Sequence, residues 1–504
     1  MRSGFPTRFL LRGLPIAGGI VLVLILVATC RQDIVVRPLV DIEVEPAAAE
    51  AFQEALAKRG LPSTIGAAPV VYRRSDPLAG RGIDVEHVDR VEVGGFDVVV
   101  RDWTSTEPRG IVIAAQTYAP VTDFLDPRIS VSLEDVVARD VAAMPLEEIR
   151  LPQKALAVDG LYPDDPGYPL RRRVEIVTRG AIEEIEEWAR LVAFDTVEEV
   201  GFVAAVGDLM VSRGVDDILV LRENGIADIF GDTAPILQNA DLTVGNLEGA
   251  VTWRTTEWPK AFNFRFRPDV LEPLKEAGFD YFSLANNHAW DYGEIGLIET
   301  LDYLEDAGIA TSGTGRNAQE AAEPWVTDLY GSEVRILGIG AFPAESTYSG
   351  AYHSLPTADR AGMLFVGDQG YAALEEAFGD DSFDIVLVHG GHEYVLRPNQ
   401  WQMRVYRTLV DLGADLVIGA HPHVLQGMEH YGDGLILYSL GNFVFPGMFV
   451  KEYAEDSAIA RFGIYGGEIR YLEFVPARLT NAIVRVSEDP VILDRFYDLS
   501  RELR

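Results

Sequence analysis

Cysteine is almost absent from this sequence, because Cys30 is the one thiol among 504 residues. An intrachain disulfide is therefore impossible, and a metal site built from several thiolates is excluded. Lysine and arginine are also scarce, with 43 of them against 78 aspartates and glutamates and a formal net charge of −35. This balance argues against binding to nucleic acid or to anionic membrane surfaces, and a polyanionic substrate would need a local basic patch.

The N-terminus has the pattern of an export segment. Arg2, Arg8 and Arg12 precede an apolar run from Leu14 to Thr29, which is somewhat shorter than the roughly 20 residues of a membrane-spanning helix. Cys30 follows directly and resembles the lipidated cysteine of a bacterial lipoprotein, although a threonine precedes it instead of the usual glycine or alanine. Lipoprotein, uncleaved anchor and simple secretion are the three alternatives. All place the body of the protein outside the cytoplasm of a bacterium, and the first two anchor it to the membrane.

The segment from residue 33 to 199 is predicted to be a smaller α/β domain after the export segment of residues 1–32. Helices are expected over residues 46–60 and 181–194, and strands over 91–100, 110–118 and 171–178. The sequences YAPVTDFLDPRISVSLEDVV and LAVDGLYPDDPGYPL weakly resemble one lobe of a periplasmic solute-binding domain. That resemblance implies ligand recognition, and a spacer or packing domain is the alternative.

A different pattern covers residues 200–477, where apolar strands alternate with polar turns and amphipathic helices. The strands with their turns are GFVAAVGD, ADLTVGNLE, FDYFSLANNH, FDIVLVHGG, ADLVIGAHPH and GLILYSLGN. Such alternation predicts an α/β domain with a largely parallel sheet, and the Val, Ile and Leu content of the strands fits burial on both faces. Residues 478–504 carry no chemical motif and are predicted to be a tail.

Polar side chains gather where these strands end. They are Asp208, Glu248, Asn286, Asn287, His288, His389, His392, His421 and His423. Five of the chain's eight histidines are among them, whereas core histidines would be scattered. Because ligands bind outside the carboxyl ends of strands in α/β sheets, these side chains are expected to form one site.

The residue types predict a site for one or two divalent metal ions. Carboxylate, amide and imidazole ligands suit Mn, Fe, Zn or Mg, and no thiolate selects a softer ion. A carboxylate such as Glu248 can bridge two cations about 4 Å apart. Metals held in this way lower the pKa of a bound water and clamp an electrophile.

The ordered motifs GD, GNLE, LANNHAWDYG, HGGHE, GAHPH and SLGNFVF resemble the CapA-type proteins of poly-γ-glutamate capsules. That group is similar to the calcineurin-like metallophosphatases. The resemblance implies a metallophosphatase-like layered α/β sandwich, an anionic extracellular polymer or its precursor as substrate, and other capsule-synthesis proteins as partners. It also implies six metal ligands, which are Asp208, Glu248, Asn287, His389, His421 and His423.

In that scheme Asp208 and His423 hold the first metal, Glu248 bridges, and the remaining three hold the second. His288 is implied to assist the chemistry without ligating. Two departures from the superfamily stand out. Its first motif is Asp-x-His, whereas Met210 occupies the histidine position here, and Glu248 replaces an aspartate. A thioether is a poor ligand for a hard divalent ion, so the first metal loses one ligand.

Two further carboxylates are candidates for the catalytic site. Asp291, three residues after His288, either orients that imidazole or caps a helix. Glu393, in HGGHEY, is a site residue by the resemblance and otherwise a surface glutamate.

Four polar residues are candidates for substrate binding. Lys260, Arg265 and Arg267 lie in KAFNFRFRPD and form either a basic patch for an anionic substrate or the wet side of a half-exposed strand. Asn442 either reaches the site or belongs to an ordinary turn after Gly441.

Three functions are compatible with the sequence. The first is a metal-dependent hydrolase or transferase that acts on an anionic capsular polymer, with His288 as general acid or transition-state donor. The alternative is a non-catalytic metal-binding protein that assembles or tethers the polymer, which Met210 favours. A sensor whose N-terminal domain captures a small molecule is the third.

Overall fold

The computed structural model describes residues 87–93, 96–102, 111–137, 141–163, 165, 168–178, 200–341, 354–379 and 382–504, with backbone alone for 87–102, 111–116 and 171–178. The predicted export segment, Cys30, and the helices expected over 46–60 and 181–194 lie outside these ranges. Within the described ranges, no helix has the length and apolar character needed to cross a membrane. The chain forms two compact units, and the longest segment of the second unit is residues 199–504.

The first unit contains an antiparallel sheet in the order β1-β2-β8-β3. Its strands are β1 (His87–Val93), β2 (Phe96–Asp102), β8 (Arg171–Thr178) and β3 (Ile111–Asp123). Short elements accompany it: β4 (Ser130–Val131), α2 (Leu133–Val137), β5 (Ala143–Pro145) and β7 (Ala157–Val158). The single strand predicted over 91–100 is instead part of two paired strands. Gly94 and Gly95 separate them, and a Gly-Gly pair favours a two-residue hairpin.

The second unit contains two sheets, and the first has the order β6-β24-β23-β9-β10-β13. Its strands are β6 (Gln153–Ala155), β9 (Gly201–Leu209), β10 (Leu242–Leu247), β13 (Tyr281–Ser283), β23 (Asp456–Tyr465) and β24 (Glu468–Thr480). β22 (Asn442–Val444) pairs with β9, and β25 (Ile483–Val486) pairs with β24. The pairs that β9 makes with β10 and β22 are parallel, whereas β23 is antiparallel to both β9 and β24.

The second sheet has the order β15-β16-β18-β19-β21-β20. Its strands are β15 (Trp325–Leu329), β16 (Ser332–Ala341), β18 (Phe383–Gly390), β19 (Leu416–Ala420), β20 (Met428–Tyr431) and β21 (Gly434–Leu437). The four inner strands are parallel and the two edge strands are antiparallel. The prediction of a largely parallel sheet therefore holds for β9, β10 and β13 at one end of the first sheet and for the four inner strands of the second. It fails where antiparallel strands extend the two sheets.

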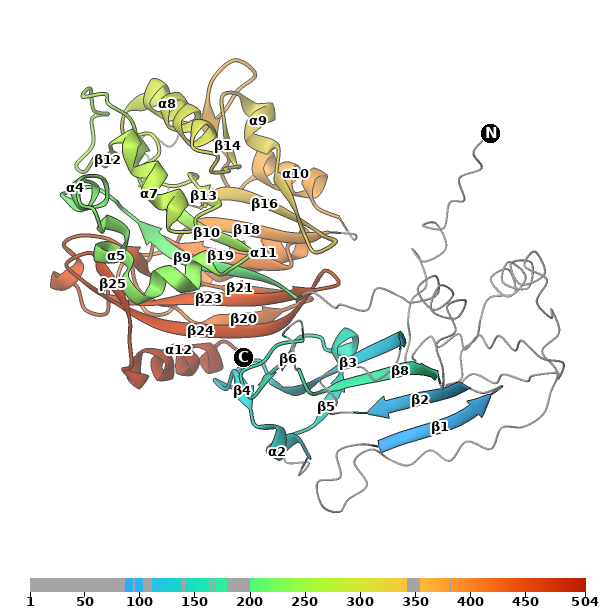
Figure 1. Ribbon diagram of the computed structural model, residues 1–504. Coiled ribbons are helices and arrows are strands. Elements are labelled where there is room, and N and C mark those ends of the chain that lie inside the picture. The colour runs from blue at the N-terminus through green and yellow to red at the C-terminus, as the bar shows by residue number, and fades with distance from the viewer. Residues whose placement is uncertain are drawn as a thin grey trace, which may run out of the picture. The chain divides into compact units, whose positions relative to one another are not determined.

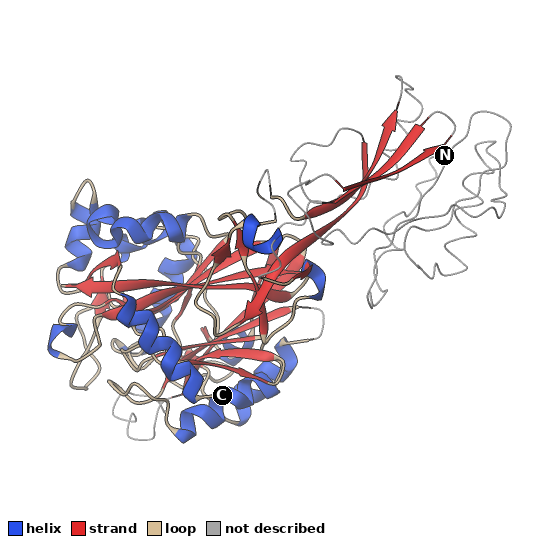
Figure 2. Cartoon of the chain, turned by 90° about the horizontal axis from the view of Figure 1, so that it is seen from below, coloured by secondary structure: helices blue, strands red, loops and turns tan. Residues whose placement is uncertain are grey.

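Helices surround the strands of this unit (Figures 1 and 2). They are α4 (Val215–Leu221), α5 (Gly225–Phe230), α6 (Ala234–Gln238), α7 (Leu271–Glu276), α8 (Gly293–Asp306), α9 (Ala318–Ala322), α10 (Asp368–Ala377), α11 (Gln400–Asp411) and α12 (Pro490–Glu502). One apolar core contains residues of both sheets, such as Val203 and Ile385, and two further cores contain residues of strands and helices. The predicted layered α/β sandwich is confirmed by this arrangement.

Residues 478–504 differ from the tail that the sequence suggests. β24 continues to Thr480, β25 pairs with it, and α12 buries Ile492 and Phe496 in the core that joins the two sheets. The spacing of apolar residues in α12 is the signal for this packing. Residues 121–129 and 149–156 also belong to the second unit, so the boundary between units is not a single cut in the sequence.

Asp415, a half-buried acid directly before β19 and far from the strand ends of interest, gives a pH prediction. Burial raises the pKa of Asp415 from 3.8 to about 7, and its carboxylate accepts a hydrogen bond of 2.7 Å from the Asp384 amide. Because the pKa of Asp415 is higher in the folded than in the unfolded state, the folded state binds the proton more tightly. The contribution of this proton to the free energy of unfolding is complete below pH 3.8 and is lost as pH rises through 7. Asp415→Asn keeps an acceptor without the charge. The free energy of unfolding should therefore rise by about 2 kcal/mol at pH 8 and change little at pH 4. Urea denaturation at the two pH values measures this, and an equal effect at both would contradict the burial argument.

Candidate metal centre

The polar residues predicted at the strand ends lie at the carboxyl ends of strands from both sheets of the second unit. Asp208 is on β9, Glu248 follows β10, His288 follows β13, His389 is on β18, and His421 and His423 follow β19. All six side chains are buried. The register brings Asn442 of β22 and Asn246 of β10 to either side of Asp208. A Cβ on Gly207 would lie 1.9 Å from the Gly441 carbonyl oxygen, so this close approach of β9 and β22 requires glycine in the GD motif.

Asp208 is fixed by donors from three directions. Its Oδ1 accepts a 2.8 Å hydrogen bond from Asn246 Nδ2, and its Oδ2 accepts one of 3.1 Å from the His421 amide. His423 Nδ1 lies 3.2 Å from Oδ2. Asn246 was not predicted as a site residue. Its place in GNLE, two residues before Glu248 on the same strand face, is the signal that could have found it.

Glu248 provides the observation that bears most directly on metal binding. Neither of its carboxylate oxygens has a hydrogen-bond partner among the residues that the structure describes, although the side chain is completely buried. Nε2 atoms of three histidines surround its Oε1, at 3.8 Å for His288, 4.0 Å for His389 and 3.9 Å for His423. These distances are too long for hydrogen bonds.

A buried carboxylate without a partner is costly unless a cation compensates it. Burial, followed by the charge of Asp208, raises the pKa of Glu248 well above its ordinary value. One potential ligand atom each from Asp208, Glu248 and His423 lie within 4.8 Å of one another, as do atoms of Glu393, His421 and His423. The two groups share His423, and this set of donors fits divalent cations.

The loop that follows β19 holds its two histidines in strained backbone conformations. His421 has a φ of 97° and His423 a φ of 57°, in the left-handed region that residues with side chains seldom adopt. Burial and the neighbouring imidazoles lower the pKa of His421 to about 3 and that of His389 well below its ordinary value. Both imidazoles are therefore neutral at pH 7 and have lone pairs for a cation.

His423 has the opposite protonation preference. Burial would lower its pKa, but the charges of Glu248 and Asp208 outweigh burial and raise the pKa to about 9. A cation that binds here would displace that proton.

Asn442 holds His423 and is not exposed to substrate. Its Oδ1 lies 2.9 Å from His423 Nδ1, and its Nδ2 donates to the carbonyl oxygens of His423 and Ala454 at 3.1 and 3.0 Å. The side chain is fully buried, and in this structure its contacts are with the protein. Both Nδ2 hydrogens are used within the protein, and Oδ1 has one contact there.

Asn442→Ala should lower the free energy of unfolding of the metal-free protein by about 2–3 kcal/mol, because two buried carbonyl groups lose their donor. Urea denaturation measures the change. The matched control is Asn224→Ala, since Asn224 precedes α5, is exposed and makes no side-chain capping hydrogen bond. Equal and small effects in both variants would show that Asn442 does not support the His423 loop.

His389 contacts Asn287 and Asn246. Its Nε2 lies 3.0 Å from Asn287 Oδ1, and its Nδ1 lies 3.1 Å from Asn246 Nδ2. A separation of about 3.0 Å is also that of adjacent ligands around an octahedral ion with bonds near 2.1 Å. Asn286, by contrast, points into the protein, where its Nδ2 donates to Asn246 Oδ1 and to the Leu247 carbonyl oxygen.

His288 is held by a buried aspartate and a buried lysine. Its Nδ1 lies 2.8 Å from Asp291 Oδ2, and Lys260 Nζ forms an ion pair with Asp291 and donates to the Asn287 carbonyl oxygen at 2.8 Å. The Phe264 ring stacks on the imidazole at 3.9 Å. Burial lowers the pKa of His288 to about 4, an effect that the charge of Asp291 opposes. The shorter contact with the Asp291 carboxylate favours a proton on Nδ1, although Lys260 Nζ also lies 3.2 Å from that nitrogen, and Nε2 lies 3.8 Å from Glu248 Oε1.

The three side chains of the predicted basic patch do not act together, because each has its own partner elsewhere in the chain. Lys260 pairs with Asp291, and burial lowers its pKa. Arg267 pairs with Asp269 and Asp217. Arg265 is exposed and donates to the Arg254 carbonyl oxygen at 2.7 Å. Phe264 and Phe266 on either side of Arg265 are buried, so the alternation marks the wet side of β12 (Arg265–Phe266).

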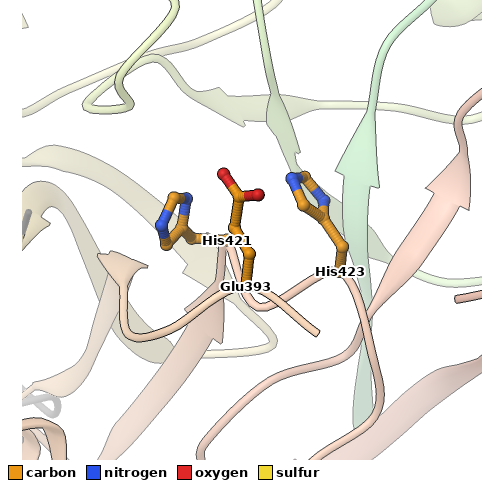
Figure 3. Close-up of side chains that lie close together, drawn as sticks. All are labelled: Glu393, His421 and His423. Carbon is orange, nitrogen blue, oxygen red and sulfur yellow. The ribbon is translucent and has the colours of Figure 1, made fainter. Parts of the chain in front are cut away.

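Two loop residues show how the site opens to solvent. Glu393 is exposed, yet its carboxylate points between the imidazoles of His421 and His423 (Figure 3). His392, its neighbour, is also exposed.

Met210 lies two residues after Asp208, directly after β9. It is fully buried in an apolar core, and its sulfur accepts a hydrogen bond of 2.9 Å from the Ser212 hydroxyl. Met210 is therefore a packing residue.

Comparison with known proteins places this site in a family context. Residues 202–447 match the family described as "Bacterial capsule synthesis protein PGA_cap". "Capsule biosynthesis protein CapA" of Bacillus anthracis is 30% identical over 283 residues, which are 54% of this chain and 66% of that protein. "PGA biosynthesis protein CapA" of Bacillus subtilis (strain 168) is 29% identical over 285 residues, 55% of this chain and 71% of that protein.

The aligned part of this chain thus spans just under two thirds of the first relative. Among solved structures, a 5'-nucleotidase from Candida albicans SC5314 aligns with 60% of this chain and 54% of its own, at 10% identity and a TM-score of 0.30. This structural likeness is too distant to indicate a shared activity.

Proposed function

We propose that the protein helps to build a capsule or another extracellular polymer, because residues 202–447 match the bacterial capsule synthesis family and resemble two CapA proteins. We further propose that it does so as a divalent-metal-dependent hydrolase or transferase. The observation that carries this proposal is the buried Glu248 carboxylate, which has no hydrogen-bond partner among the described residues and faces three imidazole nitrogens.

The residues that would hold the ions fall into two sets that share Glu248. Asp208 and His423 form one set with it, and Asn287, His389 and His421 form the other. Ions bound there would lower the pKa of water and polarise an ester, phosphoester or amide of the substrate.

His288 is proposed to carry the proton in this reaction. Its Nε2 faces the site, whereas its Nδ1–H is directed at Asp291, which fixes the tautomer and the ring plane. Asp291 would stabilise the imidazolium formed when Nε2 takes a proton. The ion pair of Lys260 Nζ with Asp291 Oδ1 compensates the charge of the aspartate. The stacked Phe264 ring excludes water from one face of the imidazole.

Two basic side chains near the site, other than the three predicted from the sequence, support the proposal of an anionic substrate. Arg213 and Lys451 are exposed, and within the described part of the chain neither side chain forms an ion pair or a hydrogen bond. Arg213 lies over the Phe264 ring at 5.2 Å, and Lys451 lies over the Tyr394 ring at 4.4 Å. Phe264 stacks on His288, and the Tyr394 ring is 5.7 Å from that of His423. We propose that both cations bind carboxylates of a poly-γ-glutamate-type polymer.

A reaction screen tests this function. The full chain, loaded with Mn²⁺ or Zn²⁺, is incubated with poly-γ-glutamate with and without an amine acceptor, and the products are separated by size and by mass. Shortened chains support hydrolysis, and chains joined to the acceptor support transfer, because the two reactions differ in the nucleophile alone. Unchanged polymer together with metal-dependent polymer binding would favour the alternative, a non-catalytic assembly or tethering protein that Met210 favours. Export, membrane anchoring and contacts with other capsule-synthesis proteins belong to the same proposal.

A further inference from the structure

The site lacks the imidazole that the superfamily's first motif supplies. Met210 is packed in an apolar core, and its thioether accepts a hydrogen bond from Ser212. A sulfur of this kind does not replace a nitrogen ligand for a hard divalent ion. An ion beside Asp208 therefore needs a donor from another segment.

Glu393 supplies a donor from the opposite side. Its carboxylate and one nitrogen each of His421 and His423 lie within 4.8 Å of one another, and the carboxylate points between the two rings (Figure 3). Within the described part of the chain, Glu393 forms no ion pair and no side-chain hydrogen bond. An exposed glutamate usually extends into water, whereas this one is directed at two buried imidazoles.

The backbone around Glu393 is tied to the histidine loop. Tyr394, with a φ of 62°, donates its amide to the Pro422 carbonyl oxygen at 2.8 Å. Gln426 Nε2 donates to the Val395 carbonyl oxygen at 2.7 Å. These bonds join residues 394–395 to residues 422–426, so Glu393 and the two histidines are positioned as one unit. Strained non-glycine residues on both loops, His421, His423 and Tyr394, are typical of a functional site.

We infer that Glu393 is a metal ligand, which joins His423 on the ion beside Asp208, next to the His421 ligand of the neighbouring ion, and takes the place of the imidazole that is missing at Met210. This inference rests on the metal-binding part of the proposed function and deepens it. Because Glu393 is exposed while the other two ligands are buried, its carboxylate forms the solvent side of the ion's coordination. A ligand on that side can leave the ion when an anionic substrate arrives, whereas the buried ligands stay in place.

A Mn²⁺ titration of the metal-free full chain, with free Mn²⁺ counted by electron paramagnetic resonance, tests the inference without any assay of activity. Glu393→Gln keeps the size of the side chain and removes its charge. We expect one ion to bind at least 10-fold more weakly in this variant, and Glu393→Asp to lie between the two proteins. The control is Glu223→Gln, an exposed glutamate between α4 and α5, which should match the wild type.

Mn²⁺ binding by Glu393→Gln with the number and affinity of wild-type sites would overturn the inference and leave the metal-dependent function standing. A lower affinity of Glu393→Gln for one Mn²⁺ ion would support the inference, even if the wild-type protein does not change the polymer. Because Glu393 is exposed, its replacement should leave the urea midpoint of the metal-free chain unchanged, so that a change in Mn²⁺ binding reports ligation and not unfolding.

Discussion

Metal-free Glu248→Gln protein should fail to regain divalent metal, with an affinity more than about 100-fold below that of the wild type. This carboxylate lies among the Nε2 atoms of His288, His389 and His423, and it is the donor that both proposed ions would share. Loss of a residue that merely orients a ligand costs about 10–100-fold in affinity, so loss of a shared ligand should cost more. Elemental analysis after incubation with Mn²⁺ or Zn²⁺ and removal of free ions measures this.

The same variant should be at least as stable as the wild type when both are metal-free. Burial disfavours the charged form of Glu248, and glutamine has the same shape without the charge, so the free energy of unfolding should be unchanged or higher by roughly 1–3 kcal/mol. Metal loss with retained stability separates a missing ligand from a misfolded site. Wild-type metal content in Glu248→Gln, or a large loss of stability, would contradict the role assigned to this carboxylate.

His288→Asn should keep bound metal and lose turnover of the polymer by about 10²- to 10⁴-fold, which is the range for removal of a general acid or base. Asparagine keeps a polar group beside Asp291 but has no nitrogen that can exchange a proton near neutral pH. Product formation per bound ion is the quantity to compare, since it separates chemistry from metal content.

The control for this variant is His430→Asn, the same substitution at a half-buried histidine of β20 that contacts none of the site residues described above. It should retain turnover within about twofold, as substitutions away from a site usually do. If His288→Asn turns over polymer at the wild-type rate, the proton is carried by another group and the His288–Asp291–Lys260 arrangement is structural.

The sequence could predict which residues come together because of where they stand. Six residues lie at or just after the carboxyl end of a buried strand, and parallel strands bring these ends to the same edge: Asp208, Glu248, His288, His389, His421 and His423. Position along the chain was enough for that conclusion. It was not enough for the roles of Asn246, Asn442 and Lys260. Those roles depend on the direction of each side chain, which is set by neighbours more than a hundred residues away for the Asn246–His389 contact.

The arginines show the same limit. FNFRFR predicts both a basic patch and a half-exposed strand, and the choice depends on whether carboxylates lie near the arginines in space. Arg267 has Asp217 as a partner across 50 residues of sequence, which no local pattern indicates. Arg213 and Lys451 lack such partners within the described part of the chain, although neither stands in a recognisable motif.

The parallel strands of the fold were predictable, whereas the antiparallel strands that extend the two sheets were not. Val-, Ile- and Leu-rich segments identify the buried parallel strands such as β18 and β19, since those strands are covered on both faces. β23 and β24 extend one sheet in the antiparallel direction, and α12 covers the core between the two sheets. Pairing of that kind depends on contacts between distant segments, so the division into two sheets does not follow from the order of strands and helices.

The most direct test of the metal centre is elemental analysis of the full wild-type chain, stripped of metal and then incubated with Mn²⁺ or Zn²⁺. The donor groups that converge on Glu248 and on His421 and His423 predict about two ions per chain. No ion above background with either metal would contradict the proposed metal centre, because the buried Glu248 carboxylate would then remain without the cation that its surroundings fit.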